Sequence, residues 1–168
     1  IDDTPEAVVI SCFDPVRKEI AKESLERLIS DGRIHPTRIE EIVQKVTHEV
    51  QNKIYEEGEK ALFDLGIHNM NTEGVRALGR LYFRTSYGQN VLNHSKEVAM
   101  VASMIAAEVG ANRELAKRAA ILHDIGKGAE NDSDQNHAEV GAEMARKMGE
   151  DARVVNAIAA HHNDVEAT

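Results

Sequence analysis

The sequence has no tryptophan, a single cysteine and only 4% aromatic residues among its 168. Few aromatics with abundant Ala, Glu, Lys and Arg favour helices over sheets. The lone Cys12 cannot form an internal disulfide, so a reducing cytosolic compartment is expected. No run approaches the ~20 apolar residues of a membrane span, and no charged-then-apolar signal segment opens the chain. These absences argue against a disulfide-stabilised secreted scaffold and a membrane helix within these residues.

What remains is an ordinary globular composition with an excess of negative charge. Hydrophobic residues make up 42% and charged residues 29%, which is typical of a protein with one good core. The net charge of −9 argues against broad electrostatic wrapping of nucleic acid. A local cationic site is compatible with it, because bound divalent metals are often the largest charges in a pocket.

Residues 1–31 have the pattern of an α/β remnant. The β-branched run at 7–13 predicts a strand, and Asp14-Pro15 predicts the start of a helix that Gly32 ends. One strand and one helix do not make a stable domain. We therefore expect the chain to be a fragment that begins near the end of a longer module.

Residues 32–70 predict a spacer region dominated by one long helix. Thr37-x-x-Glu40 is a capping box, and apolar residues then recur at helical spacing through a strongly charged stretch to about Gly58 or further. A loop is expected before the next helix begins at Thr72. A spacer of this kind separates modules.

From residue 71 onward the pattern predicts a bundle of short helices, with a turn at 85–89 (TSYGQ). Helices are expected over 91–109, 115–125 and 137–148, and after the cap Asp151. The first helix of this region is expected to bury Val75, Leu78, Leu81 and Tyr82. The helix over 91–109 is expected to bury Val98, Val101 or Ala102, Ile105 and Val109, with His94 on the same stripe.

Five histidines and one aspartate of this region fall on or beside apolar stripes. A lone histidine on such a stripe is most often a core residue with a satisfied hydrogen bond. Five buried imidazoles would need five separate polar partners, whereas one metal centre would serve them all. The pattern therefore predicts a metal site. Its candidate ligands are His94, His123, Asp124, His137, His161 and His162.

The residue types indicate which ions fit. Neutral imidazole suits transition metals, whereas Mg and Ca favour all-oxygen shells. Asp124 can span two ions, and two ions about 3.5–4 Å apart support in-line phosphoryl displacement through a bridging water. The lack of cysteine ligands argues against a closed structural zinc site. We expect one or two divalent ions, with Mn, Zn, Fe and Mg all open.

The run His123-Asp124-Ile125-Gly126-Lys127 (HDIGK), with a histidine upstream and a His-His pair downstream, resembles the HD-domain phosphohydrolase superfamily. The resemblance implies a mainly α-helical HD-domain bundle. Within this superfamily, four blocks of the sequence resemble bacterial, membrane-anchored endoribonucleases that start messenger-RNA decay. These blocks are GRIHPTRIEE (32–41), RTSYGQNVLNHSKEVA (84–99), LAKRAAILHDIGK (115–127) and AIAAHHNDVEA (157–167).

Such enzymes carry an N-terminal membrane helix, a coiled coil, a KH RNA-binding module and the HD domain in that order. The resemblance implies that 1–31 is the end of the KH module, 32–70 the spacer and 71–168 the HD domain. It places the full-length protein on the cytoplasmic side of the bacterial membrane through an anchor absent here, and the fragment in solution. It also implies single-stranded RNA as substrate, a homodimer and partners in an RNA-degradation complex.

By matching position, the resemblance implies that His94, His123 and Asp124 bind a metal. It also implies that His137, His161 and His162 match the additional histidines found in HD domains that hold two metals. HD domains also use a later aspartate, which these residues do not include, and Asp164 lies too close to the pair to replace it. The site of this chain is therefore expected to be incomplete.

Two cationic features are candidates for substrate binding. Lys127 follows the HD pair and could bind a substrate phosphate, with a solvated lysine at a helix end as the plain alternative. Arg76, Arg80 and Arg84 recur every four residues and could contact an RNA backbone, although an ordinary solvated face explains them as well. Asp124 and Lys127 are the expected catalytic residues.

Three functions stay open on the sequence. The first is metal-dependent endoribonuclease activity. The second is another HD-type reaction, on cyclic dinucleotides or nucleotides. The third is a metal-binding or dimerisation scaffold with no catalysis.

Overall fold

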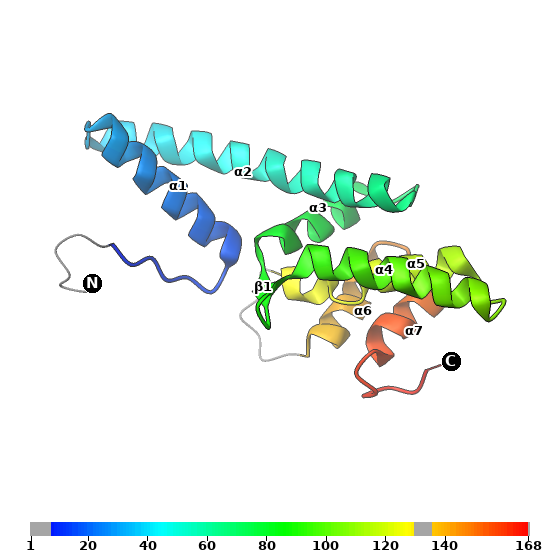
Figure 1. The fold of residues 1–168 in the computed structure, drawn as a ribbon. Helices are drawn as coiled ribbons and strands as arrows, with labels where there is room; N and C mark the ends of the chain where they lie inside the picture. The colour runs from blue at the N-terminus through cyan, green and yellow to red at the C-terminus, as the bar shows by residue number, and fades with distance from the viewer. Residues whose placement is uncertain (1–7, 130–135, 168) are drawn as a thin grey trace. The chain divides into compact units, whose positions relative to one another are not determined.

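The computed structural model describes residues 8–129 and 136–167. The fold is mainly α, as expected, with seven α-helices, two 3-10 helices and one two-stranded antiparallel sheet in the described part (Figure 1). The chain divides into two compact units, 1–53 and 54–168. The boundaries expected at 31 and 70 stay predictions. The α-helices are α1 Pro15–Asp31, α2 Pro36–Leu65, α3 Thr72–Arg80, α4 Val91–Glu108, α5 Arg113–Leu122, α6 His137–Lys147 and α7 Ala152–Ala160.

Helix α1 begins and ends as its sequence predicts. The Asp14 side chain accepts a hydrogen bond from the Val16 N–H at 2.8 Å, and Pro15 occupies the first turn. Gly32 ends the helix at a φ of 71°, a conformation that glycine adopts without steric cost. The strand expected over 7–13 is wrong for residues 8–13, which form no strand. A β-branched run needs a partner strand for its hydrogen bonds, and no described segment supplies one.

The long helix α2 is confirmed, but with a different start. It starts at Pro36, so Thr37 lies inside the first turn and is not the cap. It passes through Gly58 and ends at Leu65, in agreement with the expected end at about Gly58 or further. A Cβ at Gly58 would overlap the Val75 carbonyl, so this glycine permits close contact between α2 and α3. Close packing explains its presence, and helix termination does not.

The core of the second unit lies among α3 to α7 and the last turns of α2, which contribute Ala61, Leu62 and Leu65. Helix α4 packs against α5, α5 against α7, and α6 against α7. The largest fully buried side chains are aliphatic, and they include Leu78, Leu81, Ile121, Leu122 and Ile158. Tyr82, expected in this core, is 39% exposed, because the chain tightens into the 3-10 helix η1 (Leu81–Phe83) and changes the helical phase.

Helix α4 buries a different face from the one expected. Val101, Ile105 and Val109 are all at least 49% exposed. The face that meets the core carries small residues, which let neighbouring helices approach closely. A periodicity based on large apolar residues therefore selects the wrong side of this helix. The small residues buried on α4 include Ser95, Ala99, Ser103 and Ala106.

A short hairpin precedes α4. Strands β1 (Thr85–Ser86) and β2 (Gln89–Asn90) pair through a two-residue turn, Tyr87-Gly88. Both turn residues have positive φ, 50° and 78°, as a type I′ turn requires. Asn-Gly is the usual choice there, and a bulky L-residue costs roughly 1–2 kcal/mol in this conformation. The turn expected at 85–89 is confirmed, with an unusual residue at its tip.

Candidate metal centre

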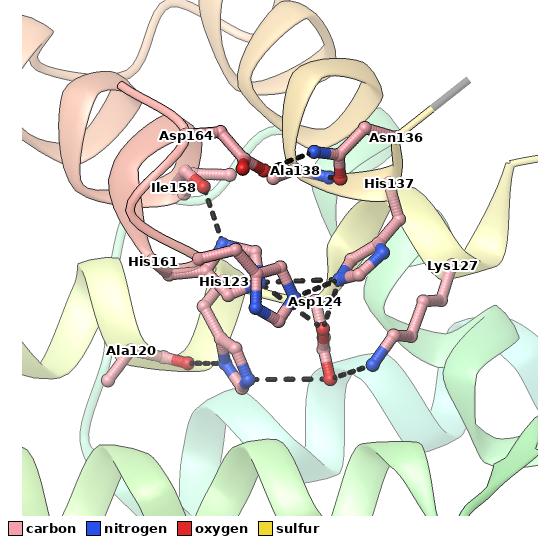
Figure 2. Close-up of polar contacts among 11 residues, drawn as sticks. Ala120, His123, Asp124, Lys127, Asn136, His137, Ala138, Ile158, His161 and Asp164 are labelled. Atoms are coloured by element: carbon pink, nitrogen blue, oxygen red, sulfur yellow. Dashed lines mark hydrogen bonds and ion pairs between the residues drawn. The ribbon is translucent and has the colours of Figure 1, made fainter. Parts of the chain in front are cut away.

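Six side chains from four segments form two neighbouring groups in the second unit, and Figure 2 shows four of them, His123, Asp124, His137 and His161. His94 comes from the first turn of α4, and His123 and Asp124 from the turn after α5. His137 is the first residue of α6, and His161-His162 directly follow α7. Within each of two groups, the candidate ligand atoms lie within 4.8 Å of one another. The first group is His94, His123 and Asp124; the second group is His137, His161 and His162.

Asp124 connects the two groups through its two carboxylate oxygens. Oδ2 lies 3.3 Å from His123 Nε2, and Oδ1 lies 3.3 Å from His137 Nε2 and 3.8 Å from His161 Nε2. The Asp124 side chain is 3% exposed, so almost all of its carboxylate surface faces these neighbours. Figure 2 shows the carboxylate between them. A carboxylate in this position can contribute to both groups.

Backbone carbonyls orient two of the imidazoles. His123 Nδ1 lies 2.7 Å from the Ala120 carbonyl oxygen, and His161 Nδ1 lies 2.6 Å from that of Ile158. A carbonyl only accepts, so each Nδ1 carries the proton and each Nε2 of the neutral ring carries a lone pair. Both Nε2 atoms point toward Asp124. Metal-binding histidines are usually held in this way by their second nitrogen.

The electrostatics favour neutral imidazoles and an ionised carboxylate. Burial, followed by the Lys127 charge, lowers the pKa of His137 to about 4. Burial also lowers the pKa of His161. Burial alone would raise the pKa of the Asp124 carboxyl, but the adjacent His123 ring and the Lys127 ammonium, which donates a hydrogen bond, outweigh it and hold that pKa below its usual range. These are the protonation states that a divalent cation requires of its ligands.

In the second group, the Nε2 atoms of His161 and His162 both lie close to His137 Nε2. His137 Nε2 lies 2.9 Å from His162 Nε2 and 3.3 Å from His161 Nε2, in addition to its contact with Asp124. One proton on His137 can be donated to only one of these acceptors. A cation among them would satisfy several lone pairs at once. The donor set, imidazole nitrogens with one carboxylate, also matches transition-metal preference. The residues therefore fit a metal.

Gly126 allows the segment that follows His123 and Asp124 to pack closely on the start of α6, which carries His137. The sequence did not reveal this role. Gly126 does not end α5, which already stops at Leu122. It lies in the 3-10 helix η2 (Ile125–Gly128), which packs on α6. A Cβ at Gly126 would overlap the His137 carbonyl oxygen and crowd the Gly141 amide nitrogen. Only glycine lets the HD turn reach the start of α6 this closely.

The cationic candidates lie in different surroundings. Lys127 Nζ donates to Asp124 Oδ2 at 2.8 Å with its side chain 18% exposed, so it is not a freely solvated lysine. Arg80 Nε donates to the Gly128 carbonyl at 2.8 Å and ties α3 to η2. The Arg76 guanidinium lies over the Tyr55 ring at 5.8 Å, and Arg84 follows η1. Contact of these arginines with RNA stays a prediction.

Two further residues near the histidines do not join them. Asp164 Oδ2 accepts a hydrogen bond from Asn136 Nδ2 at 2.6 Å and belongs to neither group. Ser95 Oγ is buried and makes no hydrogen bond within the described residues, so serine-histidine catalysis gains no support.

A small pocket adjoins the first group. His94, Asp124 and Lys127 line it, together with Val91 of α4. Residues of the hairpin line it as well, and they were not predicted to belong to the site. The only sequence signal for them was the unusual Tyr-Gly turn. These hairpin residues are Ser86, Tyr87 and Gln89.

Comparison with known proteins identifies the class first. Residues 91–168 match the family model described as HD domain, and this stretch contains all six converging side chains. This part of the chain therefore resembles the HD-domain class, which its HDIGK block suggested. No solved structure matches the chain. No helix in the described ranges combines the length and apolar character needed to cross a bilayer.

The particular protein that the chain resembles is ribonuclease Y. It is 78% identical over 168 residues to ribonuclease Y of Treponema denticola, with 100% of this chain and 33% of that protein aligned. It is 78% identical over 166 residues to ribonuclease Y of Treponema pallidum and 61% identical over 168 to that of Borreliella burgdorferi, again covering 33% of each. The chain thus spans about a third of the length of these curated relatives. The resemblance to the endoribonuclease family is confirmed.

Proposed function

We propose that this chain carries the catalytic centre of a metal-dependent endoribonuclease that hydrolyses phosphodiester bonds of single-stranded RNA during messenger-RNA decay. The observation that carries the proposal is Asp124, buried between two groups of imidazoles that fit a metal. The 78% identity to proteins named ribonuclease Y supplies the substrate class.

The six residues of the two groups would hold one or two divalent ions, with Mn, Zn, Fe and Mg as candidates. Such ions lower the pKa of a water and neutralise charge that develops on a phosphate during hydrolysis. The backbone contacts of His123 and His161 keep their Nε2 atoms available as ligands. The low pKa values of His137 and His161 keep these rings neutral near pH 7.

Lys127 is proposed to bind the phosphate that reacts. Its ammonium lines the pocket beside His94 and hydrogen-bonds Asp124 at 2.8 Å. A cation on the Asp124 carboxylate would weaken that hydrogen bond, because like charges repel over such distances. Lys127 would then be available to donate to a non-bridging phosphate oxygen, where negative charge grows during hydrolysis.

The test measures metal and turnover together. The full-length protein, purified without chelator, should contain a transition metal by mass spectrometry and cleave a single-stranded RNA in added Mn²⁺. His123→Ala should remove both metal and cleavage while circular dichroism stays helical. His68→Ala, an exposed histidine outside both groups, is the matched control and should change neither. Full cleavage by His123→Ala would overturn the proposal.

The other two functions are separated by substrate and by assembly. Turnover of cyclic dinucleotides or guanosine polyphosphates without turnover of RNA would favour the alternative HD-type reaction. A dimer with neither metal nor hydrolysis in Mn²⁺ would favour a scaffold.

The likeness to ribonuclease Y extends the proposal to the whole protein. Residues 1–31 would be the end of a KH module. The full-length protein would be a homodimer, anchored to the cytoplasmic face of the bacterial membrane and joined to other RNA-degrading partners. Sedimentation and membrane fractionation of the full-length protein would test these features.

A further inference from the structure

The pocket beside the first group has two kinds of lining residues. It is lined by the polar residues His94, Asp124 and Lys127 of the candidate site, and by residues of the β1–β2 hairpin. The pocket has a volume of about 90 Å³, well below the range for ligand sites, about 300–1,000 Å³. It has room for a group the size of one phosphate, so the base of the same nucleotide would lie outside it.

Tyr87 stands at the tip of this hairpin in a conformation that tyrosine normally avoids. Its φ of 50° belongs to the left-handed region, where a bulky side chain is a rare exception. Its side chain is 102% exposed, so the ring gains no packing within the chain that would offset this conformation. A residue that weakens local folding and contributes nothing to the core suggests a functional constraint.

Neighbouring residues supply the rest of a nucleotide site. Gln89 lines the same pocket with an amide that can both donate and accept, and Ser86 adds a hydroxyl. The Tyr87 side chain is fully exposed, whereas the Lys127 side chain is 18% exposed. The lining of one pocket therefore includes a cation that can bind phosphate, hydrogen-bonding groups and an exposed aromatic residue.

We propose that Tyr87 is a stacking platform for the nucleobase that flanks the scissile phosphate, with Gln89 and Ser86 contacting the same nucleotide. The proposal rests on the proposed function, because the phosphate is placed at Lys127 and the first group. Single-stranded bases expose their faces and stack on aromatic side chains without much sequence preference. Bases inside a duplex offer no such face, so Tyr87 would also select for single strands.

Stacking can be observed directly, because the chain contains no tryptophan. Tyr87→Trp introduces one indole at the hairpin tip, and its fluorescence should be quenched as a single-stranded trinucleotide is titrated. The same trinucleotide without its central base should quench several-fold less. Phe63→Trp is the matched control, because Phe63 is an exposed aromatic (84%) on α2 and does not line the pocket. Equal quenching with and without the base, or no quenching, would overturn the proposal.

Cleavage supplies the second measurement. Tyr87→Ala should raise KM for single-stranded RNA about tenfold with a smaller change in kcat, because a base–aromatic stack contributes an affinity of this size. Tyr87→Phe should restore the wild-type KM. On an RNA that lacks the flanking base, Tyr87→Ala and wild type should behave alike. An equal loss on both RNAs would show that Tyr87 merely shapes the hairpin.

The two measurements separate this proposal from the function on which it rests. If the wild-type chain cleaves no RNA, the endoribonuclease proposal fails, while base-dependent quenching would still support the stacking platform. If RNA is cleaved and the indole at position 87 is not quenched, the endoribonuclease proposal stands and the stacking platform fails.

Discussion

The two halves of the candidate metal centre are built differently. The first group combines two imidazoles with a buried carboxylate, and a carbonyl of the preceding helix turn orients His123. The second group consists of histidines alone, and one of them, His162, is exposed. Only His161 in that group is oriented by a backbone carbonyl among the described contacts. The comparison indicates a preorganised first group and a looser second group that depends on Asp124.

The largest expected effect comes from removing the charge that the two groups share. Asp124→Asn keeps the shape of the side chain but cannot ionise, so neither group would have its anionic ligand. We expect at least a hundredfold loss of RNA cleavage and loss of metal from both groups, because disruption of less direct metal contacts already costs about 10–100-fold. Metal analysis and kcat/KM measure the effect. Asp164→Asn is the control, and retained metal in Asp124→Asn would show that the carboxylate is dispensable.

The next largest effect is expected from a substitution that moves the two groups apart and leaves every candidate ligand in place. Gly126→Ala would push η2 away from the His137 carbonyl. Overpacking of this kind costs about 1–3 kcal/mol of unfolding free energy. We expect a lower Tm and loss of metal from the second group, with the first group partly loaded. A variant with normal Tm and full metal content would mean that the two segments can separate without consequence.

Within the site, the two groups should respond unequally to loss of one imidazole. His123→Ala removes an oriented ligand beside Asp124, and we expect a loss of cleavage above a hundredfold. His162→Ala removes an exposed ring, and we expect a loss of about tenfold. Parallel titrations with Mn²⁺ would show whether added metal restores His162→Ala more readily. Equal losses would remove the distinction between the groups.

The smallest effect is a pH dependence of the metal-free chain. The pKa of His137 falls from its ordinary 6.5 to about 4 on folding, so between these values the unfolded chain binds more protons. Stability is therefore complete above pH 6.5 and is lost as pH falls toward 4. The lowered pKa of His161 acts in the same direction. We expect the Tm of the metal-free chain to decrease as the pH falls from 6.5 to 4. In His137→Gln this decrease should be smaller. If Tm depended on pH in His137→Gln as steeply as in the wild type, this prediction would be contradicted.

The sequence predicted the site better than its surroundings. Helix caps such as Asp14 and Asp151 act locally, so their side-chain preference was sufficient to locate helix starts. The convergence of the six ligands followed from the HDIGK block and the order of histidines. The buried face of α4 could not be predicted from hydropathy, because beyond Val91 and Leu92 in its first turn it consists of alanine and serine. The packing role of Gly126 and the place of the hairpin residues in the pocket were also missed, since close approach between segments distant in sequence leaves no local pattern.

The position of Asp124 has a thermodynamic consequence for the whole centre. Its two oxygens face different groups, so polarisation of the carboxylate by a charge on one side changes its affinity for a charge on the other. Two binding events that share one anion are linked, and the linkage must be equal in both directions. Loading of this centre is therefore expected to be a coupled equilibrium, with occupancy of one half setting the apparent affinity of the other.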